Sequence, residues 1–404
     1  MILTTPRMKH QYWVLATLGC NLDCTYCFEK GKIAGSKPTY SPRDLFNFIA
    51  SGNGMYLGET SWCHQAAKPV TDCPESFDGL VWTGGEPLTN QDFIRKFNEL
   101  SEASKRKLGL EQVLQTNGTL LNRIDGVILR NLKYILVSLD GPEAIHNKNR
   151  GKGTYKKVVD NLAEIKPRFS GQVLARITAM VDPNFSIYDS IVGLEGITNT
   201  FHWQVETPMS KRSGEQRTAF LERYKSDLNE LIGYWLGKLQ RREFISIIPF
   251  ETIVRRVIFE RGKCSPLPFG NRDSGKLSVP ACGAGKNLVA IDLKGDCYGC
   301  DTLFDDPKAK IGNIHDGIRP EKFISHLSGL SEEKLEFDFS EKPGCVRRCF
   351  DCVPPEEFDF YCQSQGVLRE AIRLRMMDIW RLDSEVLRRF ELPSRISEYT
   401  EQIP

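Results

Sequence analysis

Three cysteines near the start of the chain have the spacing of a metal-binding loop. Cys20, Cys24 and Cys27 follow directly after a short apolar, β-rich run. Three thiolates on one loop can hold a cubane 4Fe–4S cluster and leave its fourth iron without a protein ligand, open to a reactant. The alternative is a zinc knuckle, which needs a fourth ligand close by. No His or Cys lies between Cys27 and Cys63, so the spacing favours an iron–sulfur cluster.

Polar residues recur where later β-rich runs end. Gly84, Gly85 and Glu86 follow the second run, and Asn117 and Ser138 end the third and fourth. Because the carboxyl ends of parallel strands meet at one edge of a sheet, we expect these residues and the cysteine loop to share one mouth. Glycines let a ligand approach the backbone closely, and a carboxylate such as Glu86 can fix a charged amine.

The order of these motifs resembles the radical S-adenosylmethionine (SAM) superfamily, whose signature is C-x-x-x-C-x-x-C with an aromatic residue before the last cysteine. The resemblance implies that SAM chelates the open iron, accepts an electron and yields a 5'-deoxyadenosyl radical that abstracts hydrogen from an unactivated carbon. It assigns these residues to the cofactor: Tyr26, Gly84, Gly85, Glu86, Asn117, Ser138 and Arg150.

Within that assignment, Glu86 lies along the methionyl amine, and Ser138 and Arg150 hold the carboxylate. The planar donor fork of arginine suits a carboxylate. A surface ion pair is the alternative for Arg150.

A second group of eight cysteines lies in the last third of the chain: Cys264, Cys282, Cys297, Cys300, Cys345, Cys349, Cys352 and Cys362. Eight thiolates are the number that two further cubanes need. The segments around Cys282 and Cys300 resemble the auxiliary-cluster module called SPASM, found in peptide-modifying radical enzymes. The resemblance therefore implies three 4Fe–4S clusters in all, one binding SAM and two auxiliary. A zinc ribbon is the alternative.

The late cysteines depart from the usual SPASM pattern. Cys345, Cys349 and Cys352 are spaced C-x-x-x-C-x-x-C, and Cys362 follows later. Cys297 is an extra candidate near Cys300. The assignment of cysteines to each auxiliary cluster therefore stays open, as does the presence of an open auxiliary iron.

Asp301 follows Cys300 and occupies the place of a proposed proton acceptor in the resembling sulfatase-maturating enzymes. A turn residue is the alternative. Cys63 and Cys73 lie in an insertion between the first helix and the second strand. Their role stays open: they are free thiols, a redox pair or part of a substrate-contacting flap.

The pattern of the elements that position these residues predicts an α/β fold. Six β-rich runs are separated by helical patterns, which predicts a partial (β/α)6 TIM-like barrel. The runs are Tyr12–Leu18, Gly79–Thr83, Gln112–Thr116, Lys133–Leu139, Val173–Met180 and Phe201–Thr207. The main expected helices are Ser41–Ala50, Asn90–Lys105 and Gln216–Arg242.

Changes in composition and periodicity along the chain predict three regions. We expect a radical SAM core over residues 1–245 and a small SPASM domain over residues 246–362, organised by metal more than by apolar burial. A C-terminal helical tail should span residues 363–404. We interpret its apolar stripe as a packing surface, which consists of Leu368, Ile372, Met376, Ile379 and Trp380.

The composition excludes several classes of protein. The 404 residues are 40% hydrophobic and 26% charged with a formal net charge of +2, so no broad basic surface for nucleic acid is expected. No apolar run suits a membrane span or a signal peptide. We expect a cytoplasmic protein, whose cysteines bind metal in a reducing compartment instead of forming disulfides.

The leading functional hypothesis is a radical SAM maturase that installs a cross-link or other carbon-centred modification in a ribosomally made peptide. The alternatives are oxidation of a sulfatase Ser or Cys to formylglycine, excision of tyramine from a peptide backbone, and a zinc-bound interaction scaffold. The expected partners are a precursor peptide or protein substrate and an electron donor such as flavodoxin or ferredoxin. Since the chain starts about nineteen residues before Cys20, leader recognition, if required, would use a separate leader-binding protein or the core's own surface.

Overall fold

A computed structural model describes most of the chain. The described residues are 8–27, 36–51, 62–63, 68–69, 77–104, 108–206, 212–258, 288–319, 355–391 and 395–399. Within them, eleven strands form one sheet in the order β13-β12-β11-β10-β1-β4-β5-β6-β7-β8-β9. Strands β2 (Trp62–Cys63) and β3 (Lys68–Pro69) form a separate antiparallel pair.

The six expected β-rich runs are strands of the main sheet, and neighbours among them pair in parallel. They are β1 (Met8–Thr17), β4 (Phe77–Gly84), β5 (Leu110–Thr116), β6 (Leu132–Ser138), β7 (Gln172–Ala179) and β8 (Thr200–Val205). In β6, every residue from Tyr134 to Val137 is buried. Parallel strands covered on both faces have such continuous apolar runs, which is why the sequence pattern found them. The α/β prediction is confirmed.

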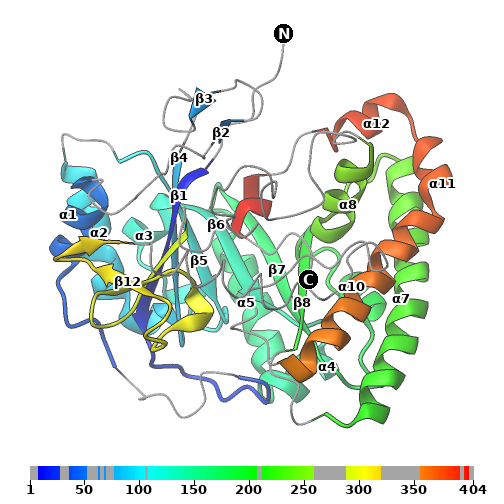
Figure 1. The fold of residues 1–404 in the computed structure, drawn as a ribbon, viewed down its shortest axis with the longest axis horizontal. Helices are drawn as coiled ribbons and strands as arrows, with labels where there is room; N and C mark the ends of the chain where they lie inside the picture. Colours follow the sequence, from blue (N-terminus) through cyan, green and yellow to red (C-terminus); the bar gives the residue numbers. More distant parts are fainter. Residues whose placement is uncertain are drawn as a thin grey trace, which may run out of the picture.

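Helices cover the sheet and fix the course of the chain between strands (Figure 1). They are α1 (Pro42–Ser51), α2 (Gln91–Ala103), α3 (Gly126–Asn131), α4 (Glu143–Arg150), α5 (Thr154–Ile165), α6 (Ile187–Val192), α7 (Gly214–Gln240) and α8 (Ile248–Ile258). The long helix α7 begins with a capping box, in which Ser213 Oγ accepts from the Gln216 amide and the Gln216 side chain accepts from the Ser213 amide.

Aromatic packing holds β4 against α2. Trp82 is fully buried and meets Phe97 edge to face at 5.2 Å between ring centroids. Trp82 Nε1 donates to Gln112 Oε1 at 2.9 Å, which satisfies its polar atom inside the core. An aromatic pair of this kind contributes about 0.5–1.5 kcal/mol beyond area burial. This packing fixes the end of β4, where Gly84 and Glu86 follow.

The sheet continues past the residues expected to end the core. Strand β9 (Ser246–Ile247) pairs in parallel with β8, and β10 (Leu288–Ile291) pairs in parallel with β1. From β10 the chain continues through the antiparallel strands β11 (Asp296–Tyr298), β12 (Lys310–Asn313) and β13 (Gly317–Ile318). All four residues of β10 are buried, so this part of the expected metal-organised module also rests on apolar packing against the core.

The C-terminal helices begin earlier than expected and are interrupted. They are α10 (Pro355–Leu374), α11 (Met376–Trp380) and α12 (Ser384–Arg388). Helix α10 lies beside α7, where Phe360 packs on Phe220 at 5.9 Å (Figure 1). Trp380 is 45% exposed, so its place in the apolar stripe is wrong. Ile379, beyond the break at Arg375, stays fully buried on the stripe, whereas Trp380 is the last residue of α11 and leaves it.

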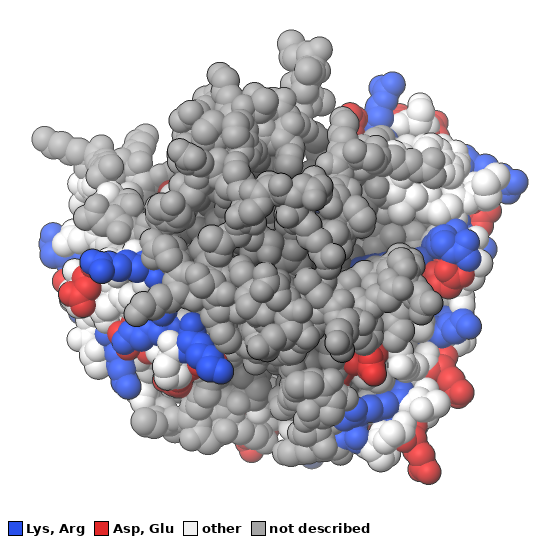
Figure 2. Space-filling view, in the orientation of Figure 1, with Lys and Arg blue, Asp and Glu red and all other residues white. Residues whose placement is uncertain are grey.

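The described surface carries both signs of charge. Figure 2 shows Lys and Arg beside Asp and Glu on both flanks of this face. In the part of the chain that the structure describes, no helix is long and apolar enough to cross a bilayer.

Candidate functional site

The cysteine loop follows β1 and is held by backbone hydrogen bonds. Cys20 is exposed, and Cys24 and Cys27 are half-buried. The Cys27 amide donates to Cys24 O at 3.2 Å, and the Thr25 amide donates to Asn149 O at 2.9 Å. Burial raises the pKa of the Cys20 and Cys24 thiols.

Among the described residues, no three His, Cys, Asp or Glu side chains are grouped to hold one metal ion. Zinc ligands must converge on one ion, whereas the thiolates of a cubane each bind a different iron.

The glycine turn after β4 packs against the segment that leads into this loop. Gly84 has φ +126°, and a Cβ there would stand closer than 3.0 Å to Thr17 O. A Cβ on Gly85 would stand 2.5 Å from Gly19 O. The Gly85 amide donates to Thr17 O at 2.9 Å, and the Glu86 amide donates to Gly19 O at 2.8 Å. Both glycines are thus required by a close approach of two backbone segments.

Glu86 is fully buried beneath the turn. Its Oε1 accepts from the Leu88 amide at 3.1 Å and from Thr116 Oγ1 at 2.8 Å, and Oε2 accepts from the Asn117 amide at 2.7 Å. Burial raises its pKa to about 7, and these three donors limit the rise. The carboxyl group therefore joins the ends of β4 and β5 and has a protonation state that a nearby cation would decide.

Asn117 connects the end of β5 to the cysteine loop. Its Nδ2 donates to Asn21 Oδ1 at 2.9 Å and lies 3.8 Å from Cys20 Sγ, within hydrogen-bonding range of sulfur. Its Oδ1 accepts from the Thr119 amide and hydroxyl at 2.9 and 2.7 Å. Asn117 is thereby oriented toward Cys20 on one side and fixed on the other.

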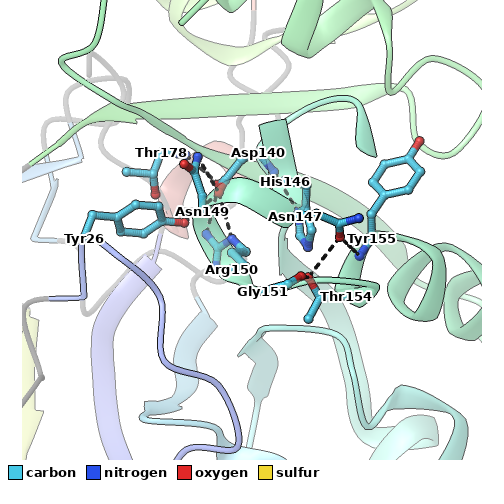
Figure 3. Close-up of polar contacts among 10 residues, drawn as sticks. All are labelled: Tyr26, Asp140, His146, Asn147, Asn149, Arg150, Gly151, Thr154, Tyr155 and Thr178. Atoms are coloured by element: carbon cyan, nitrogen blue, oxygen red, sulfur yellow. Dashed lines mark hydrogen bonds and ion pairs between the residues drawn. The ribbon is translucent and has the colours of Figure 1, made fainter. Parts of the chain in front are cut away.

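One buried carboxylate, Asp140, gathers donors from several elements (Figure 3). Tyr26 Oη donates to Oδ2 at 2.8 Å, and Arg150 donates through Nε to Oδ2 and through Nη2 to Oδ1, both at 3.0 Å. The Thr178 amide donates to Oδ1 at 3.2 Å, and Asn149 Nδ2 donates to Oδ2 at 3.4 Å. We call these five residues the Asp140 network. It joins the cysteine loop, α4 and the end of β7 to the end of β6.

The network is almost closed to solvent, since Asp140 is fully buried and Arg150 is 7% exposed. Burial would raise the pKa of Asp140, but the Arg150 charge and its hydrogen bonds outweigh burial and hold that pKa below its ordinary value. The Arg150 guanidinium also lies 5.2 Å from the centroid of the Tyr26 ring. Arg150 therefore forms an ion pair, but a buried one at the mouth of the sheet and not one on the surface.

His146 supports the network from α4. The Asp140 amide donates to His146 Nδ1 at 3.4 Å. Burial, with the Arg150 charge, lowers the pKa of His146 to about 4, so its ring is neutral near neutral pH.

Ser138 ends β6 beside a polar layer of the sheet. It is half-buried and is the register partner of Arg176 on β7. The Arg176 guanidinium donates to Gln115 Oε1 at 2.7 Å and to Gln204 Oε1 at 2.6 Å. The expected residues Tyr26, Glu86, Asn117, Ser138 and Arg150 thus all lie at the carboxyl ends of β1 and β4–β6 or just beyond them.

The predictions missed Asp140 as a site residue. A signal was present, because an aspartate directly after a strand lies ten residues before the arginine that the resemblance singled out. Such a carboxylate is a natural partner for a buried guanidinium.

Two of the eight late cysteines have described side chains. Cys297, in β11, is fully buried with Sγ 3.7 Å from Gly295 O, and burial raises its pKa strongly. Cys300 is half-buried, with Sγ 3.1 Å from Thr302 Oγ1 and 3.6 Å from Asp301 Oδ1. Asp301 therefore lies beside the Cys300 sulfur.

The other cysteine predictions depend on parts of the chain with little described structure. Cys362 is in helix α10, and Cys63 pairs with Lys68 in the β2–β3 hairpin. The remaining predicted ligands and Cys73 lie outside the described residues: Cys264, Cys282, Cys345, Cys349 and Cys352. Their ligand roles stay predictions.

Comparison with known proteins identifies the class. Residues 14–186 match the model of the radical SAM superfamily. The chain therefore contains a radical SAM domain and is an enzyme, and the superfamily of that domain uses a 4Fe–4S cluster and SAM.

Two relatives extend the likeness over most of the chain. A cysteine-type anaerobic sulfatase-maturating enzyme of Clostridium perfringens is 26% identical over 90% of this chain and 96% of its own length. A serine-type anaerobic sulfatase-maturating enzyme of Bacteroides thetaiotaomicron is 24% identical over 89% of this chain and 83% of its own.

Solved structures share the fold. The enzyme anSMEcpe with bound AdoMet superposes with a TM-score of 0.66 at 22% identity, covering 96% of this chain and 98% of that one. SuiB of Streptococcus suis, bound to its precursor peptide SuiA, gives 0.52 at 13% identity, covering 91% and 71%. The TIM-like core that the sequence predicted is thus the fold of this chain.

Proposed function

We propose that this enzyme modifies a peptide or protein substrate by radical chemistry, and that its substrate is a ribosomally made peptide in which it forms a carbon-centred cross-link. The observation that carries the radical chemistry is the single mouth of the sheet. There the cysteine loop meets a buried glutamate, a hydrogen-bonded asparagine and a buried arginine–aspartate pair. A peptide substrate is supported by the likeness over nearly the whole chain to enzymes that act on, or are bound to, polypeptides.

The described residues fit the cluster and SAM. Cys20, Cys24 and Cys27 would hold the 4Fe–4S cluster, and the exposure of Cys20 leaves room for it at the mouth. When bound, the cluster and SAM supply a 5'-deoxyadenosyl radical. Asn117 would orient the Cys20 thiolate, because its amide already lies within reach of that sulfur.

The chain's own polar groups would bind the two charged ends of the methionyl part. Glu86 has a pKa near 7, so an adjacent ammonium group would favour its carboxylate form and gain a charge-assisted partner. Gly84 and Gly85 would keep the Glu86 turn in place. Ser138 and Arg150 would bind the carboxylate, with Arg150 already oriented by Asp140.

The second cysteine set would hold two auxiliary clusters. Cys297 and Cys300 are the described candidates, within β11 and just beyond it. Strand β11 pairs with β10, and β10 pairs with β1, the strand that leads to Cys20. Asp301, next to the Cys300 sulfur, would accept the proton released when a substrate radical is oxidised. Flavodoxin or ferredoxin would supply electrons, and a separate protein could bind a leader.

The decisive experiment uses anaerobically reconstituted enzyme with SAM and a reductant. We expect iron and sulfide for three cubanes and release of 5'-deoxyadenosine. Peptides encoded beside the gene should lose hydrogen on cross-linking, seen by mass spectrometry. Cys24→Ala is the matched control and should abolish 5'-deoxyadenosine release. No mass change in any such peptide, with SAM cleavage intact, would refute the cross-linking hypothesis.

Formylglycine formation is the second candidate and has equal support from comparison. It is favoured by the coverage of the sulfatase-maturating relatives, 90% of this chain, and by Asp301 beside Cys300. Sulfatase-derived peptides with Cys or Ser at the modified position should then give an aldehyde that a hydrazine reagent traps. A shortened peptide would instead indicate backbone excision. Zinc as the only metal, without SAM turnover, would indicate the scaffold.

A further inference from the structure

Asp140 has no role in the chemistry described above, yet it accepts hydrogen bonds from residues of three separate segments. Tyr26 comes from the cysteine loop, Asn149 and Arg150 from the end of α4, and Thr178 from β7. Figure 3 shows the side chains of Tyr26, Asn149 and Arg150 pointing toward the Asp140 carboxylate, to which Thr178 contributes its backbone amide. Tyr26 lies between Cys24 and Cys27, so its hydroxyl is a direct connection between the carboxylate and the loop.

The ion pair within the network constrains Arg150 on one edge. Its Nε and Nη2 both donate to Asp140, and the structure records no hydrogen bond on Nη1 among the described residues. A guanidinium with one edge fixed has a defined direction for its remaining nitrogen. Nη1 therefore remains available for one further acceptor without rotation of the guanidinium.

The backbone of Asp140 is also held. Its amide donates to His146 Nδ1, and the Leu139 amide donates to Arg176 O at 3.2 Å. Gly141 follows with φ +139°, and a Cβ there would stand 2.8 Å from Ser190 Oγ. The carboxylate is thus presented from a turn that packing fixes, which a positioning group requires.

We propose that Asp140 is a positioning residue that sets two things with one carboxylate: the place of the cysteine loop, through Tyr26, and the orientation of Arg150 toward SAM. Cluster retention and SAM affinity are then coupled through Asp140. The inference rests on the proposed ligand roles of Cys24 and Cys27 and on the proposed role of Arg150.

Three variants separate the connection of Asp140 to the cysteine loop, through Tyr26, from its connection to SAM, through Arg150. Tyr26→Phe removes the hydroxyl that reaches the loop, Arg150→Lys keeps the charge but loses the fork, and Asp140→Asn keeps the shape but loses the charge. Asp182→Asn is the matched control, because Asp182 follows β7 as Asp140 follows β6, but pairs with Lys148 at the surface. Each reconstituted protein is assayed for iron loss to a chelator and for the SAM-induced change in the electron paramagnetic resonance signal of its cluster.

We expect cluster retention and SAM affinity to change separately. Tyr26→Phe should speed cluster loss by about tenfold or more, the scale of one hydrogen bond to a charged group, and should weaken SAM binding less than Arg150→Lys does. Arg150→Lys should weaken SAM binding by about tenfold and leave cluster retention within about twofold. Asp140→Asn should change both by about tenfold or more, since it leaves a buried charge unpaired. Adding Tyr26→Phe to Asp140→Asn should speed cluster loss no further.

Other outcomes overturn the inference. It is wrong if Asp140→Asn matches Asp182→Asn in both assays, or if Tyr26→Phe weakens SAM binding as much as Arg150→Lys does. Should Asp140→Asn fail to fold by circular dichroism, the separate responses of the other two variants decide the question. If wild-type protein binds no SAM-responsive cluster, the proposed function itself fails, and this result is distinct from a wild-type-like Asp140→Asn.

Discussion

The sharpest test of the site's architecture is Gly84→Ala. A methyl group at this position would meet Thr17 O at less than 3.0 Å, and the backbone has φ +126°. The obstructing atom belongs to the backbone of β1, so no side-chain rotation can relieve the overlap. Relief requires β1 and the turn to separate, which breaks the bond from the Gly85 amide to Thr17 O and displaces the segment before Cys20.

The magnitude follows from three contributions. A side chain at a left-handed φ costs about 1–3 kcal/mol. Overpacking against fixed atoms adds about 1–3 kcal/mol, and loss of the amide bond adds about 1 kcal/mol. We therefore expect Gly84→Ala to destabilise the protein by about 3–7 kcal/mol.

Two control glycines separate these contributions. Gly153 has φ +78° but open space around a Cβ, so Gly153→Ala reports backbone strain alone. Gly126 has open space and no positive φ, so Gly126→Ala should be neutral or slightly stabilising. Thermal unfolding of the three variants, with iron content in parallel, should rank them Gly126→Ala, Gly153→Ala, Gly84→Ala from most to least stable. A Gly84→Ala protein as stable as Gly153→Ala, with full iron content, would refute the close approach of β1 and the turn.

Three further predictions concern charge, coupling and surface. Burial raises the pKa of Glu86 and of Glu251 from 4.5 to about 7, so the folded protein binds more protons than the unfolded chain between these values. The free energy of unfolding should therefore fall as pH rises from about 4.5 to about 7, by about 3 kcal/mol for Glu86. Glu86→Gln and Glu251→Gln should each flatten the pH dependence of the unfolding midpoint. A pH dependence as steep as that of the wild type would contradict this. Tyr361→Phe removes a 2.8 Å bond to Glu206 O and should cost about 0.5–1.5 kcal/mol in thermal unfolding, whereas no loss would mean that α10 is not anchored there. Lys156→Ala removes an exposed pair with Asp160 and should leave the thermal unfolding midpoint unchanged, and a clear drop in that midpoint would contradict this.

The parallel core could be predicted from sequence because its signal is local. In β6, a continuous apolar run between polar ends identifies a strand buried on both faces, and Ser138 at its end marks the mouth. The cysteine loop was equally readable, since its three thiols lie within one short segment. The grouping of Glu86 and Asn117 then followed from the parallel order of the strands.

Features that depend on distant partners could not be predicted in this way. Strand β10 is only four residues long and lies in a region rich in glycine and cysteine, and its partner β1 is far away in sequence. Asp140 looked like one more polar residue at a strand end, because its role depends on where α4 brings Arg150. Trp380 was misplaced because α11 ends at this residue, and a periodic pattern does not show where a helix ends.

The pairing of β1 with β10 has a consequence for how the chain reaches its native state. Strand β1 lies between β4 and β10, so its outer row of amides and carbonyls stays unpaired until residues 288–291 arrive. An open strand edge is a template for unwanted association between chains, and pairing across such a long loop is slow. Strand β1 is therefore synthesised long before the strand that covers its edge, and a fragment that ends before residue 288 should aggregate through that edge.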